Sequence, residues 1–205
     1  MIRAVVFDIG GVLEITPPTG WQQQWASQLG LSDEQFRTLL ADPIRAGALG
    51  HIDLGRFTAT AQKLLELDDE QTVAFIEDIW HEYLGTPNTE LIDYFTALRG
   101  RVRTGILSNS FVGAREREQS RYGFEDRCGA VVYSHEIGVM KPDPAAYGAV
   151  CDRLEVEPTE VVFLDDTQIC VEGAEAVGMK AVLYRDNGQA IASIEAHLRD
   201  PARPR

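Results

Sequence analysis

The chain has 205 residues, of which 44% are hydrophobic and 25% charged, as expected for one globular domain or one domain carrying an insertion. Its 32 acidic residues outnumber 19 basic residues, which gives a formal net charge of −13 at pH 7. That charge repels polyanions, so we expect neither nucleic-acid binding nor docking on an anionic membrane. A small phosphorylated ligand is still compatible, because a bound cation can reverse the field within one cleft.

The sequence predicts a cytoplasmic protein. Asp8 interrupts the apolar start of the chain, so no signal peptide is predicted, and no run of about 18 apolar residues suggests a membrane span. Cys128, Cys151 and Cys170 match no metal-binding spacing. Free thiols in a reducing compartment are therefore expected.

The first half of the chain changes its pattern after one strand. Residues 2–7 are short, apolar and β-branched, which predicts a buried strand. Residues 15–20 are rich in proline and glycine, which predicts a loop. Between residues 21 and 85 the apolar side chains recur at helical spacing, with Ser32 among the candidate N-caps. This stretch predicts a bundle of about four helices.

Strands and helices alternate after residue 87. The predicted strands cover 101–107, 130–133, 161–164 and 180–184, and the predicted helices cover 88–99, 111–122, 143–154, 170–177 and 189–199. Alternation of this kind predicts right-handed βαβ units and a parallel sheet. We therefore predict an α/β fold, a Rossmann-like parallel sheet with a helical bundle inserted after the first strand. Residues 1–15 and 86–205 would form the core domain and 16–85 the helical domain, with residues 201–205 frayed.

Polar side chains follow the predicted strands at the edge where an open parallel sheet binds ligands. These side chains are Asp8, Ser108, Lys141, Asp165 and Asp166. Carboxylate oxygens are ligands that Mg²⁺ prefers. A metal and an ammonium group neutralise a transferring phosphoryl group, and a carboxylate can act as its nucleophile. The combination predicts phosphoryl chemistry.

Four segments resemble, in order, the motifs of the haloacid dehalogenase superfamily. They are DIGGVL (8–13), LSNS (107–110), GVMKPDP (138–144) and FLDDT (163–167). The helical insertion stands where one branch of that superfamily carries an α-helical cap, and LGHIDLGRF (49–57) is similar to the cap sequence. The resemblance covers nearly the whole chain. It implies that residues 16–85 close over the substrate and select its leaving group.

The resemblance also implies a role for each motif residue. Asp8 would be the nucleophile that takes the phosphoryl group, and Lys141 would offset the charge of Asp8 and of the phosphate. Ser108 and the backbone N–H of Asn109 would bind the phosphate. Mg²⁺ would be held by oxygens of Asp8, Gly10, Asp165 and Asp166. The expected function is that of a Mg²⁺-dependent phosphatase of a small phosphorylated metabolite, acting through an aspartyl-phosphate.

Gly10 departs from the family pattern, because family phosphatases usually carry an aspartate there as general acid and base. Such a group contributes roughly 10²–10⁴-fold to the rate. Some sugar-phosphate phosphatases of this branch resemble the chain in having glycine, so hydrolysis is still expected. An anomeric phosphate is a better leaving group than an ordinary alkyl phosphate and would need the acid least, which points to a sugar 1-phosphate. Glu14 and His51 are the candidate replacements.

Other functions are compatible with the same motifs. The alternative to a phosphatase is a catalytically impaired protein that keeps a binding or regulatory role, since Gly10 replaces the usual acid and base. A phosphomutase fits less well, because it reuses the aspartyl-phosphate with the help of that group. Dehalogenation is disfavoured by the pair Asp165 and Asp166, because dehalogenases need no metal. No motif indicates an oligomeric state.

Overall fold

A computed structural model describes residues 1–16 and 18–199 of the chain, so the expectation for residues 201–205 lies outside the described part. The centre of the fold is a five-stranded sheet with the order β5-β4-β1-β6-β7. Its strands are β1 (Ala4–Phe7), β4 (Arg103–Ser108), β5 (Ala130–Tyr133), β6 (Val161–Asp165) and β7 (Lys180–Leu183). All neighbouring strands are parallel. The predicted α/β fold with a parallel sheet is confirmed.

Strand β1 lies in the middle of this sheet because its whole length is apolar. Ala4 pairs with Arg103 of β4 on one side and with Val161 of β6 on the other. Its four side chains are fully buried, as in a strand that is covered on both faces. Val5 and Phe7 enter the hydrophobic cluster on one face, while the two other side chains enter the cluster on the opposite face.

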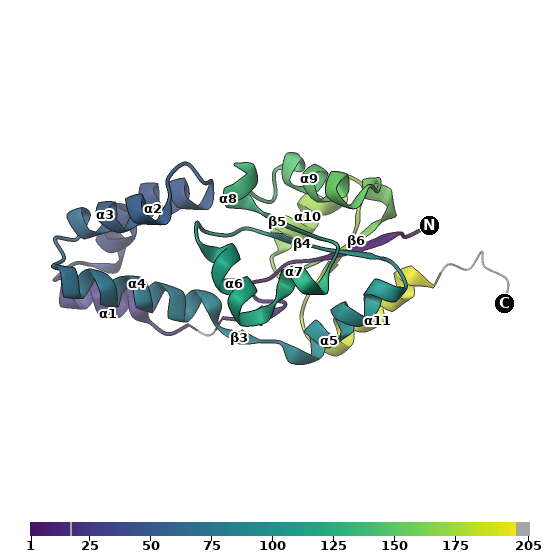
Figure 1. Ribbon diagram of the computed structural model, residues 1–205, viewed down its shortest axis with the longest axis horizontal. Coiled ribbons are helices and arrows are strands. Elements are labelled where there is room, and N and C mark those ends of the chain that lie inside the picture. Colours follow the sequence, from purple (N-terminus) through teal and green to yellow (C-terminus); the bar gives the residue numbers. More distant parts are fainter. Residues whose placement is uncertain (17, 200–205) are drawn as a thin grey trace.

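Helices cover both faces of the sheet (Figure 1). One face packs against α5 (Thr89–Ala97) and α11 (Asn187–Leu198), through side chains such as Phe95 and Ile194. The other face packs against α9 (Pro144–Leu154) and α10 (Gln168–Ala176), through Tyr147 among others. The short helices are α6 (Ala114–Tyr122), α7 (Phe124–Arg127) and α8 (Ser134–Ile137), with single 3₁₀ turns at Leu98–Gly100 and Pro158–Glu160. The small helices α7 and α8 were not predicted.

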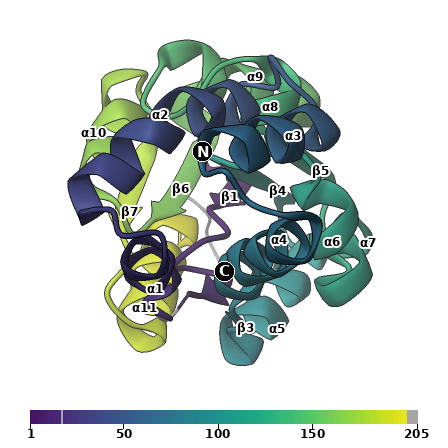
Figure 2. The same cartoon turned by 90° about the vertical axis from the view of Figure 1, so that its left-hand side faces the viewer.

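Four helices fill the stretch predicted to be a bundle. They are α1 (Trp21–Gln28), α2 (Asp33–Ala48), α3 (Leu54–Leu64) and α4 (Asp69–Leu84). Ser32 caps α2 as expected, in a capping box with Gln35. The four helices lie together beyond one end of the sheet, on the left in Figure 1 and facing the viewer in Figure 2. The division into domains at residues 15 and 85 stays a prediction.

Two short strands that the sequence did not predict flank the helical insertion. β2 (Glu14–Ile15) pairs antiparallel with β3 (Thr86–Pro87). Each has two residues, which is too few to produce an alternating pattern in the sequence. The pair brings the entry and exit of the insertion side by side, and it places Glu14 next to the segment that follows β1.

The loop after β4 connects the sheet to the helical insertion through a packing contact. Its Phe111 side chain lies in the hydrophobic cluster of the helical insertion, with its ring centroid 4.7 Å from that of Phe57. Gly47 of α2 has no Cβ, and a Cβ at this position would clash with the Phe111 ring. The insertion is therefore packed against a segment three residues after Ser108. None of the described helices is long and apolar enough to cross a membrane.

Candidate active site

The motif residues meet at the carboxyl ends of the central strands. Asp8 directly follows β1, Ser108 is the last residue of β4, and Asp165 is the last residue of β6. Lys141 comes from the loop between α8 and α9. These four residues are buried, whereas Asp166 is exposed. The chain thus delivers the predicted residues to one edge from separate loops, as the parallel sheet requires.

Three carboxylates form a cluster that fits a divalent cation. One oxygen each from Asp8, Asp165 and Asp166 lies within 4.8 Å of the others. Gly11 makes room for this cluster, because a Cβ there would clash with the Asp166 carboxylate. Mg²⁺ is bound through oxygen ligands and keeps waters and substrate oxygens as further ligands. The donor set therefore suits Mg²⁺, which would supply charge neutralisation for a phosphate group held beside it.

Lys141 balances part of this negative charge. Its ammonium nitrogen lies 2.9 Å from Asp8 Oδ1 and 2.6 Å from Asp165 Oδ2. Burial alone would lower the pKa of Lys141, but the carboxylates of Asp8 and Asp165 raise it above its ordinary value. Lys141 therefore stays charged. Its single positive charge does not balance the three carboxylates of Asp8, Asp165 and Asp166. A divalent cation would compensate that excess.

The pKa of Asp8 also reflects the excess of negative charge at this site. Burial raises the pKa of Asp8 to about 7, Lys141 opposes this shift, and the nearby Asp165 carboxylate adds to it. The backbone N–H of Ile9 donates a hydrogen bond to Asp8 Oδ1 at 2.8 Å, which orients the carboxylate. A cation beside Asp8 would lower its pKa and favour the charged form that a nucleophile needs.

Asn109 has a structural contact that the sequence did not reveal. Its side-chain amide donates to the carbonyl of Lys141 at 2.9 Å and accepts from the backbone N–H of Lys141 at 2.8 Å. This double hydrogen bond fixes the lysine loop against the end of β4. Ser108 is buried beside it and lines the cavity next to the carboxylates. The side chain of Asn109 thus positions Lys141, and its backbone N–H is the group expected at the phosphate.

A cavity of about 250 Å³ adjoins these residues between the sheet edge and the helical insertion. The residues that line it are Ile9, Gly10, Glu14, Thr16, Trp21, Gln22, Ile79, Glu82, Tyr83, Ser108, Asn109 and Glu118. Its volume is below the usual range of about 300–1,000 Å³ for drug-sized ligands.

Of the two proposed replacements for the missing acid, only Glu14 lines this cavity. Glu14 is 1% exposed, and burial, followed by the neighbouring Glu118, raises its pKa to about 8. His51 is exposed and does not line the cavity. Sequence reasoning did not find Glu118, because it lies in a charged helix that resembles a solvated surface. Only the fold turns that side chain inward, where it is 1% exposed.

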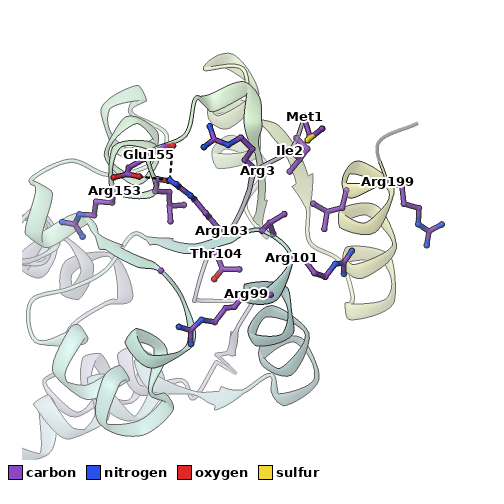
Figure 3. A pocket seen from close by; sticks show the side chains of 15 residues that line it. Met1, Ile2, Arg3, Arg99, Arg101, Arg103, Thr104, Arg153, Glu155 and Arg199 are labelled. Carbon is purple, nitrogen blue, oxygen red and sulfur yellow. Dashed lines mark hydrogen bonds and ion pairs between the residues drawn. The ribbon is translucent and has the colours of Figure 1, made fainter. Parts of the chain in front are cut away.

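A second cavity, of about 1,330 Å³, lies near the amino ends of β1 and β4 and contains none of the motif residues. Its wall is rich in arginine, and Figure 3 shows these side chains spread around the rim. Three of the arginines pair with glutamates, as Arg3–Glu160, Arg101–Glu195 and Arg103–Glu155. The smaller cavity is the better candidate for catalysis, because it adjoins the buried carboxylates and Lys141.

A parallel sheet with buried carboxylates and a lysine at its carboxyl edge is typical of α/β proteins that bind a cation and a phosphate group. The model of one such family, the haloacid dehalogenase-like hydrolases, matches residues 2–178 of the chain. The chain belongs to this hydrolase family, which confirms the resemblance of its four motifs.

Several curated relatives are phosphatases. Phosphatase MT3486 of Mycobacterium tuberculosis is 39% identical over 95 residues, which cover 45% of this chain and 43% of that protein. D-ribitol-5-phosphate phosphatase of Bacteroides thetaiotaomicron is 26% identical over 176 residues, covering 81% and 84%. Bifunctional epoxide hydrolase 2 of Sus scrofa is 26% identical over 95% of this chain and 38% of its own length. The chain thus spans less than half of the mycobacterial and porcine relatives.

Solved structures share the fold. A haloacid dehalogenase family enzyme of Bacteroides thetaiotaomicron, in complex with magnesium and inorganic phosphate, superposes with a TM-score of 0.76 at 20% identity, covering 93% of this chain and 99% of the other. A phosphatase of the same family from Thermococcus onnurineus has a TM-score of 0.64 at 26% identity, covering 91% and 88%. At 20% identity, the similarity to the Bacteroides thetaiotaomicron enzyme shows a shared fold alone.

Proposed function

We propose that the protein is a Mg²⁺-dependent phosphatase that hydrolyses a small phosphorylated metabolite. The observation that carries this proposal is the buried cluster in which Lys141 lies between Asp8 and Asp165, with Asp166 completing a set of carboxylate oxygens within 4.8 Å. Membership of a hydrolase family that includes phosphatases supports it. The related fold that holds magnesium and phosphate supports the choice of cofactor.

The residues take the following roles in this proposal. Asp8 attacks the phosphorus, and the bond to the leaving-group oxygen breaks to give an aspartyl-phosphate, which water then hydrolyses. Lys141 keeps the nucleophile ionised and offsets the charge of the phosphate, while Ser108 and the backbone N–H of Asn109 bind phosphate oxygens. The carboxylates of Asp8, Asp165 and Asp166, with the carbonyl of Gly10, hold Mg²⁺.

The helical insertion forms the cap of this site in the proposal. Trp21 and Tyr83 of the insertion line the cavity opposite Ser108, so this part of the chain contacts the leaving group. A sugar 1-phosphate matches the small cavity and the glycine at position 10. Cys128, Cys151 and Cys170 are free and buried in the structure, and the proposed location stays the reducing cytoplasm.

Phosphate release from a panel of sugar phosphates, other metabolites and an aryl phosphate tests the proposal, with Mg²⁺ and with a chelator. We expect release that needs Mg²⁺ and that falls to background in Asp8→Asn, because an amide cannot form the acyl phosphate. Asp152→Asn removes an exposed carboxylate from α9, outside the four motifs, and is the matched control. Unchanged release in Asp8→Asn would refute the mechanism. A folded, Mg²⁺-binding protein without turnover would favour the binding role.

A further inference from the structure

Two carboxyl groups in the catalytic cavity lack a counter-charge. Glu14 and Glu118 are each 1% exposed and line the same cavity as Gly10 and Ser108. Glu14 Oε1 accepts from the Thr16 hydroxyl at 3.0 Å, but Glu14 Oε2 has no partner among the described residues. A buried carboxylate without a partner is costly, so this pair needs an explanation.

Glu118 repeats the pattern in the wall of the same cavity. Its Oε2 accepts from the Tyr133 hydroxyl at 2.6 Å, whereas its Oε1 has no partner within the described part of the chain. Burial raises its pKa to about 7 and the charge of Asp8 adds to that shift, while the hydroxyl groups of Tyr133 and Tyr83 oppose it. Each carboxyl therefore has one oxygen without a hydrogen-bond partner, and burial destabilises both groups as anions.

Among the described residues no lysine, arginine or histidine forms an ion pair with Glu14 or Glu118, although Arg121 and Arg115 lie close enough to oppose the pKa shifts of these two groups. No lysine, arginine or histidine is among the described residues that line the cavity, while Glu82 adds a third carboxylate to the wall. Arg115 is held by Glu125 and Glu136, and Arg121 donates to the carbonyl of Gly85. A positively charged group that occupies the cavity would therefore supply the counter-charge.

We propose that the cavity recognises a leaving group that carries a positively charged amine, bound between the free carboxylate oxygens of Glu14 and Glu118. This inference rests on the proposed phosphatase function and narrows its substrate class to aminated phosphate esters, such as those of amino sugars or amino alcohols. An ammonium group offers three donors and can satisfy both oxygens at once. The cavity volume of about 250 Å³ admits a leaving group of that size.

Charge separation along the site agrees with this assignment. Lys141 and the metal carboxylates lie at the phosphate end, and the two glutamates line the cavity that adjoins it. A substrate with a negative phosphate and a positive amine matches both ends. A neutral sugar would leave the two buried carboxyls without a counter-charge.

The test compares matched pairs of esters that differ in one amine. With Mg²⁺ present, kcat/KM is measured for D-glucosamine 6-phosphate against D-glucose 6-phosphate and for ethanolamine phosphate against 2-hydroxyethyl phosphate. We expect the amine to be preferred in at least one pair by roughly ten- to hundredfold, the value of a hydrogen bond to a charged group. Equal kcat/KM values within both pairs would overturn the proposal.

Glu14→Gln and Glu118→Gln keep the shape of the side chains and remove their charge. Each is expected to reduce the preference for the amine about tenfold or more, mainly through KM, whereas Glu34→Gln removes an exposed charge of the insertion and should preserve it. An equal loss on the amine and the neutral ester in both variants would mean that these carboxyls serve the chemical step, and would overturn recognition of an amine.

A binding measurement separates failure of this proposal from failure of the phosphatase function. An aryl phosphate that is hydrolysed with dependence on Asp8, together with no preference for amines, would leave the phosphatase intact and overturn the inference. If no ester is hydrolysed at all, Asp8→Asn with Mg²⁺ is titrated with the two hexose phosphates and its Tm is recorded. A larger Tm increase with glucosamine 6-phosphate supports recognition of the amine, and equal shifts refute it.

Discussion

Gly10 is the residue at which the chain leaves its family pattern, and the structure shows that space does not require the glycine. A Cβ placed on Gly10 would meet no atom within 4 Å, and its φ angle is not in the left-handed region. Gly11 next to it has φ +72 and a Cβ there would clash with Asp166. Lack of space therefore does not explain why position 10 carries no acidic side chain.

Gly10→Asp is accordingly expected to fold and to add a general acid at the cavity. Hydrolysis of an unactivated alkyl phosphate should rise by up to roughly 10²–10⁴-fold, because a poor leaving group gains most from protonation. An aryl phosphate should gain much less. Steady-state kinetics on both esters measures the difference, with Gly11→Asp as the variant expected to disrupt the site. A uniform change on both esters would contradict the prediction.

Glu118 gives the metal-free protein a specific pH dependence. Burial raises its pKa from 4.5 to about 7, so below pH 4.5 it is protonated in both the folded and the unfolded state. Between pH 4.5 and 7 the unfolded chain releases this proton and the folded chain retains it. Rising pH therefore favours unfolding across that window, by about 3 kcal/mol in total.

Urea unfolding of the wild type and of Glu118→Gln at pH 4.5 and 7.5, both with chelator, measures this contribution. The variant should gain stability relative to the wild type as the pH rises, by about 3 kcal/mol over the interval. Glu34→Gln, at an exposed position, should show no such change. A pH-independent difference between wild type and Glu118→Gln would contradict the assignment of the shift to burial.

At the scale of elements, the loop between β4 and α6 links the phosphate end of the site to the helical insertion. Ser108 and Asn109 face the site, while Phe111, three residues after Ser108, is buried among the aromatic side chains of α3 and α4. Movement of the insertion relative to the sheet would therefore pull on the segment that is expected to bind phosphate. The sequence suggested a helix from residue 111, whereas α6 begins at Ala114 because residues 111–113 pack into the insertion.

Phe111→Ala should consequently weaken both stability and phosphate binding. Loss of a buried phenylalanine costs about 3–5 kcal/mol through lost burial and the cavity left behind. Phe111→Leu keeps most of the volume and should cost less. Urea unfolding gives the stability change, and KM for an aryl phosphate reports on the loop. An unchanged free energy of unfolding in Phe111→Ala would show that the contact does not hold the insertion.

For the whole molecule, the net charge of −13 and the acidic cluster at the site make cation binding a stabilising event. Mg²⁺ should raise the Tm of the wild type, since binding to the folded state at 100 times Kd contributes about 2.7 kcal/mol. Asp166→Asn should lose most of this increase, because it removes an exposed ligand without disturbing the core. Thermal unfolding at constant ionic strength separates specific binding from screening, and an equal increase in Asp166→Asn would refute the metal site.

The elements that the sequence predicted well are those with a strong local pattern. Short apolar runs indicate the buried strands. The spacing of apolar residues and N-caps such as Ser32 indicate the helices of the insertion. Because parallel strands place their carboxyl ends at one edge, the motif order predicts that Asp8, Lys141 and Asp165 lie close together. The two-residue strands β2 and β3 lack any such pattern, so their pairing was not predictable.

The sequence by itself therefore determined the fold class, the family and the residues that approach a cation and a phosphate, since those follow from periodicity and from motifs next to strand ends. Only the tertiary structure decided what surrounds them. Glu118 lies in a helix whose sequence is almost wholly polar, and Glu14 in a strand of two residues. Their burial around one cavity depends on how α6, β2 and the helical insertion pack, a long-range arrangement that no local pattern records.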